Sequence, residues 1–253
     1  MNPSDKAPRV TSGPGSVSWA GAVLFLSLLM VQMAGADPLP AEQGRVPRQE
    51  THRRVPLLNS LEIRGPLGVL TQWKRILRDA RSQMEKLKNS IPGSDPCPPG
   101  AASWKEFLSR ARGMTGFDQL KFVNRFFNRW PYRLDKDIYG VSDYWATPQE
   151  FLRFSGDCED YCITKYFALR ELGYYPEQLR IVVLRDAIRN ITHATLAVYL
   201  DNHVYILDNL SDGVFDQGRY SHYFPQYSFN EQNRWAHIPL KAFTPKKLSE
   251  EKR

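Results

Sequence analysis

The chain has 253 residues, of which 42% are hydrophobic and 24% are charged, and its formal net charge is +7. This length predicts one or at most two domains, with enough apolar mass for a sizeable core. The composition excludes a wholly disordered, collagen-like or coiled-coil protein. The positive charge is spread along the chain and no nucleic-acid-binding motif accompanies it, so charge alone does not indicate a nucleic-acid partner.

The first 36 residues have the three parts of a secretory signal peptide. Lys6 and Arg9 precede an apolar run from Trp19 to Met33, and an Ala-x-Ala cleavage site follows at 34–36. The apolar run is shorter than the roughly 20 residues that a membrane-spanning helix needs, which favours a cleaved peptide over an uncleaved anchor. We therefore expect a mature protein that begins at Asp37 and is soluble outside the cytoplasm.

The rest of the chain predicts an α+β fold. Residues 37–60 are expected to form a flexible lead-in to a single domain over 61–243, with a frayed tail at 244–253. Apolar spacing predicts helices over 67–88, 102–112, 116–130, 148–155 and 157–172. Runs rich in β-branched residues predict strands over 180–185, 194–200 and 204–207 and near 229–238. Helices followed by an antiparallel sheet give one α+β domain.

One cysteine has the surroundings of a nucleophile. The sequence GDCEDY at 156–161 places Cys158 at the start of a predicted helix. Unpaired backbone N–H groups and the helix dipole there favour the thiolate, the reactive form of the thiol. Such a nucleophile needs a base and a group that orients the base. The candidates are His193, which precedes the strand over 194–200, and Asp208, which follows the strand over 204–207.

Strand pairing brings these two candidates to one face of the predicted hairpin. A two-residue turn at Asp201 and Asn202 makes residue 195 face Asp208. His193 is then the diagonal neighbour of Asp208, about 7–8 Å away at Cα, a gap that two side chains bridge. Taken singly, an inert buried cysteine, a core histidine and a turn-forming aspartate are the commoner roles. The three together predict a cysteine endopeptidase, with the backbone N–H of Cys158 as one oxyanion donor.

The other two cysteines are not assigned to the catalytic group. Cys162 lies one helical turn after Cys158 and is interpreted as a small core residue rather than a resolving thiol. Cys97 stands in a Pro-rich loop and is a candidate free thiol. No second Cys/His pair has the spacing of zinc ligands.

Three acids surround the candidate nucleophile: Asp157, Glu159 and Asp160. Their charges would raise the pKa of the Cys158 thiol and oppose the thiolate. Helix capping explains each acid separately, since Asp157 is the expected N-cap and Asp160 stands three residues later. A bound Ca²⁺ explains all three, because calcium takes several carboxylate oxygens. We favour calcium, with Asp157 and Glu159 as the first ligands and Asp160 next.

Around GDCEDY (156–161), THA (192–194) and LDN (207–209), the chain resembles the bacterial transglutaminase-like cysteine proteinases, the LapG-type periplasmic proteases. The likeness extends upstream through VNRFFN (123–128) and DYWATPQEF (143–151). It implies a papain-like, transglutaminase-like fold. It also implies a calcium ion near the active site.

The resemblance implies a biological role as well. Members of the family cleave a large surface adhesin near its N-terminus, typically at a di-alanine, and so release the cell from a biofilm. An inner-membrane receptor that senses cyclic di-GMP holds them inactive. By that analogy we expect this chain in the periplasm of a Gram-negative bacterium. Two alternatives stay open from the residues: a transglutaminase-type acyl transferase with the same triad, and a non-catalytic binding protein on the same fold.

Overall fold

The structure, a computed structural model, describes residues 55–91, 93 and 97–240. Its α-helices are α1 (Thr71–Asn89), α2 (Ala101–Ala111), α3 (Gly116–Phe127), α4 (Asp135–Tyr139), α5 (Pro148–Phe154) and α6 (Cys158–Glu171). Its strands are β1 (Ser60–Gly65), β2 (Leu179–Asp186), β3 (Ile191–Leu200), β4 (His203–Leu207), β5 (Phe215–Asp216), β6 (Tyr223–Phe229) and β7 (Arg234–Pro239). Short 3-10 segments occur at η1 (Leu57–Asn59), η2 (Leu67–Val69), η3 (Pro176–Gln178) and η4 (Gln217–Arg219).

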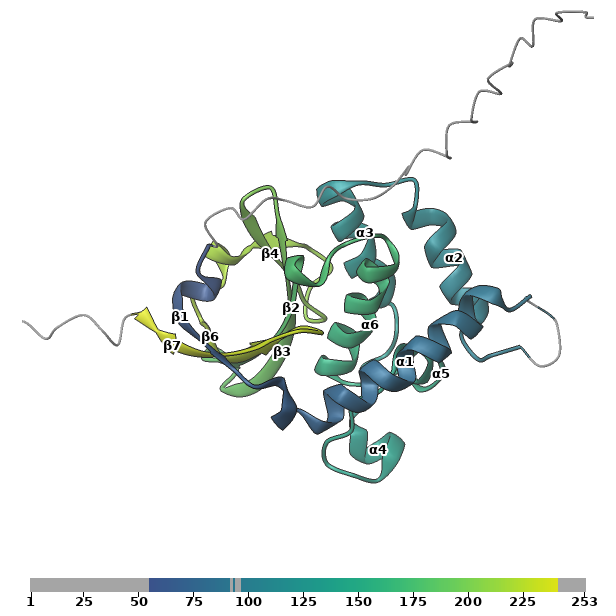
Figure 1. Cartoon of the computed structure of the whole chain (residues 1–253), viewed down its shortest axis with the longest axis horizontal. Helices are drawn as coiled ribbons and strands as arrows, with labels where there is room; N and C mark the ends of the chain where they lie inside the picture. Colours follow the sequence, from purple (N-terminus) through teal and green to yellow (C-terminus); the bar gives the residue numbers. More distant parts are fainter. Residues whose placement is uncertain (1–54, 92, 94–96, 241–253) are drawn as a thin grey trace, which may run out of the picture. The chain divides into compact units, whose positions relative to one another are not determined.

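The strands form one sheet in the order β1-β7-β6-β2-β3-β4-β5, and each neighbouring pair is antiparallel. The helices gather on one side of it, and α6 is the helix that packs on β2 and β3 (Figure 1). The α+β fold class is therefore confirmed. None of the helices in the described part of the chain has the length and apolar character that crossing a bilayer requires.

Helix α6 lies in the main core rather than on the surface. Its buried residues are Asp160, Tyr161, Cys162, Ile163, Thr164, Lys165, Tyr166, Ala168 and Leu169. The ring of Trp73 on α1 packs edge-on against Tyr166 of α6, with centroids 5.5 Å apart, and against Phe229 of β6 at 5.1 Å. Aromatic contacts of this kind fix how α1, α6 and the sheet lie against one another. The end of α6 that begins at Cys158 is thereby held in place.

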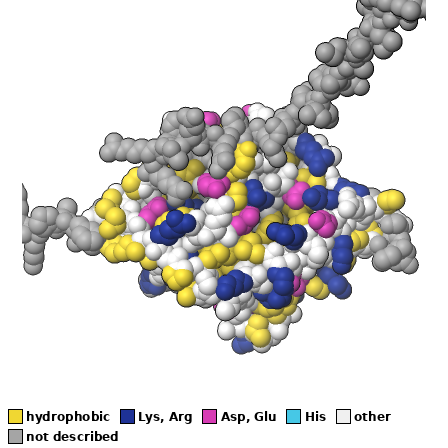
Figure 2. Space-filling model, viewed as in Figure 1, with side chains coloured by type: hydrophobic (Ala, Val, Ile, Leu, Met, Phe, Trp, Pro, Cys, Tyr) yellow, Lys and Arg dark blue, Asp and Glu magenta, His cyan; other side chains and the backbone are white. Residues whose placement is uncertain are grey.

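The face drawn in Figure 2 does not separate charge by sign. Figure 2 shows basic and acidic side chains interspersed over the face that it draws. The net charge of +7 is therefore not gathered into a single basic patch on this face.

Most element ends differ from prediction by a few residues, and two predicted segments differ in kind. The lead-in expected over 37–60 ends earlier, because Leu57 is fully buried against the sheet and β1 begins at Ser60. The single strand expected near 229–238 is instead a hairpin of β6 and β7. Its turn is stabilised by Asn230, whose side-chain oxygen accepts the N–H groups of Gln232 and Asn233. The predicted signal peptide and the tail over 244–253 lie outside the described residues.

The β3–β4 hairpin has the predicted register. Leu200 pairs with His203, so that Asp201 and Asn202 form a two-residue turn. Both turn residues have positive φ, 50° for Asp201 and 62° for Asn202. This is the type I′ geometry, whose twist matches that of the flanking strands.

We expect Asn202→Gly to leave the free energy of unfolding unchanged or to raise it, and Asn202→Val to lower it by about 1–2 kcal/mol. The reason is that a β-branched side chain is strained at positive φ and glycine is not. Urea unfolding measures both effects. The control is His203→Val, one residue later in a strand, which should not lower stability. An equal loss in both valine variants would contradict the assignment.

Candidate active site

His193 and Asp208 are joined by a buried hydrogen bond. His193 stands on β3, and Asp208 follows the last residue of β4. The His193 Nε2 atom lies 2.9 Å from Asp208 Oδ1, and the two residues are only 3% and 1% exposed. The hydrogen bond predicted from strand pairing is confirmed.

The Asp208 carboxylate accepts hydrogen bonds from two further donors. Its Oδ1 accepts the N–H of Leu210 at 2.9 Å, and its Oδ2 accepts the hydroxyl of Tyr223 at 2.8 Å. Burial raises the pKa of Asp208, but the hydrogen bonds from His193, Leu210 and Tyr223 lower it more, and the pKa lies below its ordinary value. An ionised carboxylate has no proton to donate, so His193 donates from Nε2. Its Nδ1 is then free to accept a proton.

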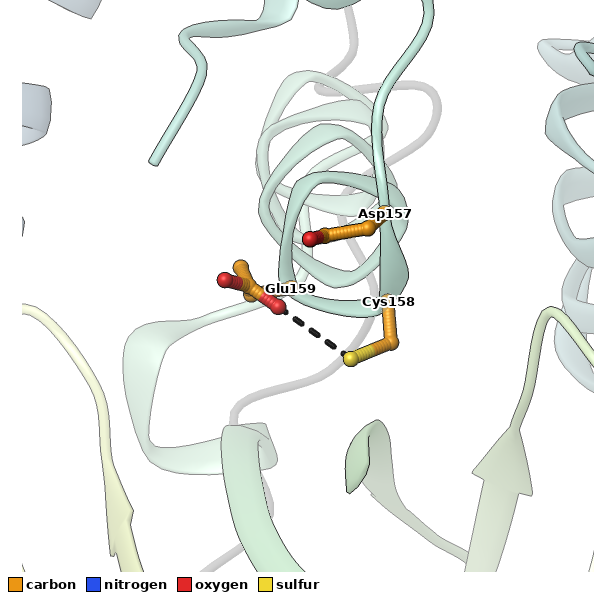
Figure 3. Close-up of side chains that lie close together, drawn as sticks. All are labelled: Asp157, Cys158 and Glu159. Atoms are coloured by element: carbon orange, nitrogen blue, oxygen red, sulfur yellow. Dashed lines mark hydrogen bonds between the residues drawn. The ribbon is translucent and has the colours of Figure 1, made fainter. Parts of the chain in front are cut away.

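Cys158 is the first residue of α6, directly after the N-cap residue Asp157. The helix packs against β3, the strand that carries His193. The Cys158 thiol donates to Glu159 Oε2 at 3.1 Å, and Figure 3 shows the two side chains turned toward one another. Burial and then the charge of Glu159 raise the pKa of Cys158. The expected effect of the neighbouring acids on the thiol pKa is therefore seen, whereas the lowered pKa expected at a helix start is not, because burial and a neighbouring carboxylate both disfavour the thiolate.

The segment before Cys158 is built around the Asp160 carboxylate. Asp160 Oδ1 accepts the N–H of Ala146 at 2.6 Å, and its Oδ2 accepts the N–H of Asp157 at 3.1 Å. Both oxygens of this buried acid therefore already have backbone donors. Gly156 lies against it, and its carbonyl accepts the N–H of Arg133 at 2.9 Å. The chain after α3 is thus tied to the residues that lead into Cys158.

Two acids that sequence reasoning missed lie beside Asp157 and Glu159. Carboxylate oxygens of Asp135, Asp143 and Glu159 lie within 4.8 Å of one another, and so do those of Asp135, Asp157 and Asp160. Asp135 and Asp143 belong to an acidic stretch that includes α4, and their spacing gives no local signal of contact with α6. The five acids come together only in the fold.

The cluster has the properties of a cation site. Asp135 Oδ1 and Asp157 Oδ1 are buried and accept no hydrogen bond. Burial and then neighbouring carboxylates raise the pKa of Asp157, and burial raises the pKa of Asp135 in spite of the N–H that Tyr144 donates to it. Such carboxylates oppose their own ionisation unless a positive charge joins them. An all-oxygen donor set of this kind suits a hard cation such as calcium.

The other two cysteines lie in the core or against it, as expected for Cys162. Cys162 is buried in the main core, and Cys97 packs at its edge. All three cysteines of the chain are free thiols. A resolving disulfide between Cys158 and Cys162 is therefore not formed.

We expect Gly156→Ala to lower the free energy of unfolding by about 1–3 kcal/mol, the usual cost of an overpacked buried site. A Cβ atom at residue 156 would lie 2.1 Å from Oδ2 of Asp160, a side chain that is held by one backbone N–H group on each of its two oxygens. The matched control is Gly113→Ala, because a Cβ atom there meets no atom within 4 Å. Urea unfolding of both variants tests the difference, and equal stability would contradict the packing described.

Comparison with known proteins gives a family for the chain. Residues 97–242 match the model of the bacterial transglutaminase-like cysteine proteinase family. Among curated proteins, none matches significantly. Among solved structures, calcium-bound Legionella pneumophila LapG is 31% identical over 64% of this chain and 86% of its own, with a TM-score of 0.50. Another structure of Legionella pneumophila LapG is 34% identical over 54% of this chain and 77% of its own, with a TM-score of 0.49.

The matched region is more than half of the chain and includes every candidate site residue described above. The α+β architecture agrees with the transglutaminase-like fold of that family. The chain belongs to the bacterial transglutaminase-like cysteine proteinases and is a cysteine protease.

Proposed function

We propose that the protein is a calcium-dependent endopeptidase whose catalytic residues are Cys158, His193 and Asp208. The observation that carries the proposal is the buried His193–Asp208 hydrogen bond on a hairpin that packs against the helix beginning at Cys158. Membership of a cysteine proteinase family supports the same roles.

In the proposed mechanism, His193 Nδ1 takes the proton of the Cys158 thiol. The thiolate attacks the peptide carbonyl carbon, and the tetrahedral oxyanion accepts the backbone N–H of Cys158 at the helix start. Collapse of this species breaks the C–N bond, and the His193 imidazolium gives its proton to the leaving amine. Water, deprotonated by His193, then hydrolyses the thioester and restores the thiol. Asp208 keeps the imidazole oriented and stabilises its charged form.

Calcium would be held by oxygens of Asp135, Asp143, Asp157 and Glu159, with Asp160 as a further candidate. The two buried carboxylate oxygens without hydrogen bonds support this assignment. The calcium-bound structure of Legionella pneumophila LapG adds support by likeness. When bound, the ion supplies positive charge that offsets the carboxylates around Cys158. Glu159 bound to the ion would no longer accept the thiol proton so readily, which favours the thiolate.

We further propose that the substrate is a large surface adhesin cut near its N-terminus at a di-alanine, with release of the cell from a biofilm as the result. The regulator would be the periplasmic part of an inner-membrane receptor for cyclic di-GMP. The sequence resemblance to the LapG-type proteases and the signal-peptide pattern at 1–36 support this role and a periplasmic location. Co-purification of this protein with the periplasmic part of the receptor tests the partner. Cell fractionation tests the location.

A transglutaminase-type acyl transferase uses the same thioester, and only the acceptor differs. Hydrolysis in the presence of an added primary amine separates the two activities. Release of free peptide acid without amide product supports the endopeptidase. Transfer of most of the acyl group to the amine would establish the transferase instead.

We expect Cys158→Ala, His193→Ala and Asp208→Ala each to lower kcat for cleavage of a di-alanine peptide by about 10³-fold or more, with unchanged circular dichroism. Since triad members act as a unit, the double variant Cys158→Ala/His193→Ala should be little worse than either single variant. Cys162→Ala is the control and should keep most activity. Turnover by Cys158→Ala close to that of the native protein would exclude this residue as the nucleophile.

We expect EGTA to lower both the activity and the Tm, and added Ca²⁺ but not Mg²⁺ to restore them. Asp135→Asn or Glu159→Gln should remove the response of Tm to calcium, because each deletes a charged ligand. Asp118→Asn is the control, since Asp118 is exposed and pairs only with Lys121 in the described structure.

The rise of Tm on addition of Ca²⁺ should weaken as pH falls, because the pKa values of the buried ligands are raised and protons compete with the ion. A Tm that is insensitive to EGTA would leave helix capping as the role of the acids.

A further inference from the structure

A fully buried lysine lies under the catalytic loop. Lys165 stands on α6, two helical turns after Cys158, so that Cys158, Cys162 and Lys165 share one face of the helix. Its Nζ donates to Asn124 Oδ1 and to Asn128 Oδ1, both at 2.7 Å. The centroid of the Tyr161 ring lies 5.6 Å from Nζ. The ammonium is therefore surrounded without any direct carboxylate partner among the described residues.

The two asparagines also form hydrogen bonds to the loop that contains Asp208. Asn128 Nδ2 lies within hydrogen-bond distance of the main-chain oxygens of Asp208 and Ser211, both at 3.0 Å. Asn124 Nδ2 donates to the same Ser211 oxygen at 2.7 Å. The loop over 208–212 is thus held to α6 through α3, by a route that does not include His193.

Stability does not explain a charge at this position. Burial lowers the pKa of Lys165 to about 8, although Cys162, Asp208 and Asp212 act in the opposite direction. The folded state therefore binds the proton of Lys165 less tightly than the unfolded chain does, and the buried ammonium opposes folding at neutral pH. A methionine fills similar volume without this cost. What the ammonium adds is two strong, directed hydrogen bonds that orient both asparagine amides.

We propose that Lys165 is a positioning residue of the catalytic apparatus, which through Asn124 and Asn128 fixes the Asp208 loop relative to the helix that carries Cys158. Asp208 is then held twice, by its carboxylate on His193 and by its main-chain oxygen on Asn128. The first contact orients the base. The second sets where the base lies with respect to the nucleophile. This inference rests on the proposed triad.

The test measures the rate of alkylation of Cys158 by iodoacetamide against pH, in calcium buffer, with peptide mass spectrometry to separate the three thiols. The rate near neutral pH reports the thiolate that His193 stabilises and needs no protein substrate. We expect Lys165→Met and Asn128→Asp each to lower it on the order of 10- to 100-fold, as a displacement of about 1 Å does in an active site. Asn128→Asp keeps the acceptor for Lys165 but deletes the donor to the loop.

Gln119→Ala is the matched control. Gln119 is also buried on α3 and donates to two main-chain oxygens, those of Ala111 and Met114, away from the Asp208 loop. It should lose stability but keep the alkylation profile. The double variant Lys165→Met/Asn128→Asp should be no slower than the worse single variant, because the residues act in one chain of contacts.

Native alkylation profiles in folded Lys165→Met and Asn128→Asp would overturn the inference, and so would an equal loss in Gln119→Ala. If Lys165→Met does not fold, Asn128→Asp alone decides between the outcomes. Asp208→Ala is measured alongside. A native alkylation profile for Asp208→Ala would overturn the triad itself. Slow alkylation of Asp208→Ala, together with native profiles for Lys165→Met and Asn128→Asp, would overturn only the role of Lys165.

Discussion

Burial of helix α6 is the constraint on which the site depends. The helix is apolar on more than one face and packs between the sheet and the other helices, so it can neither rotate nor slide without opening the core. Its first residue is the proposed nucleophile, its first turn supplies acids to the candidate calcium cluster, and Lys165, two turns later, contacts the asparagines that hold the Asp208 loop. One packed helix thus sets three parts of the chemistry at once.

The electrostatics of the site follow from the same burial. Low-dielectric surroundings make the carboxylates near Cys158 repel one another strongly, and they also make each hydrogen bond to Asp208 stronger than it would be in water. Asp208 has three donors and stays ionised, whereas Asp157 has an oxygen without any. The proposed orienting carboxylate and this candidate metal ligand therefore differ in the number of their hydrogen-bond donors, not in residue type.

Sequence reasoning predicted the parts of the site that depend on local geometry. The His193–Asp208 contact follows from side-chain alternation across one short hairpin, and Cys158 follows from a helix start. Asp135 and Asp143 were missed because their approach to Glu159 depends on how a loop folds over α6. The pairing of β1 with β7 joins residues far apart in the chain, and the burial of Lys165 depends on two asparagines of another helix. Contacts between residues far apart in the chain leave no periodic pattern in the sequence from which they could be predicted.

The β3–β4 turn also limits how this family of sequences can vary in length. Side chains alternate between the two faces of a strand, so a single inserted or deleted residue at Asp201–Asn202 that shifts the pairing would turn Asp208 to the opposite face from His193. A change of two residues would preserve the alternation. Natural insertions that keep the enzyme active are therefore expected in even steps at this turn, or as a bulge that absorbs the extra residue. The length of an exposed turn is thus constrained by the proposed catalytic pair, His193 and Asp208.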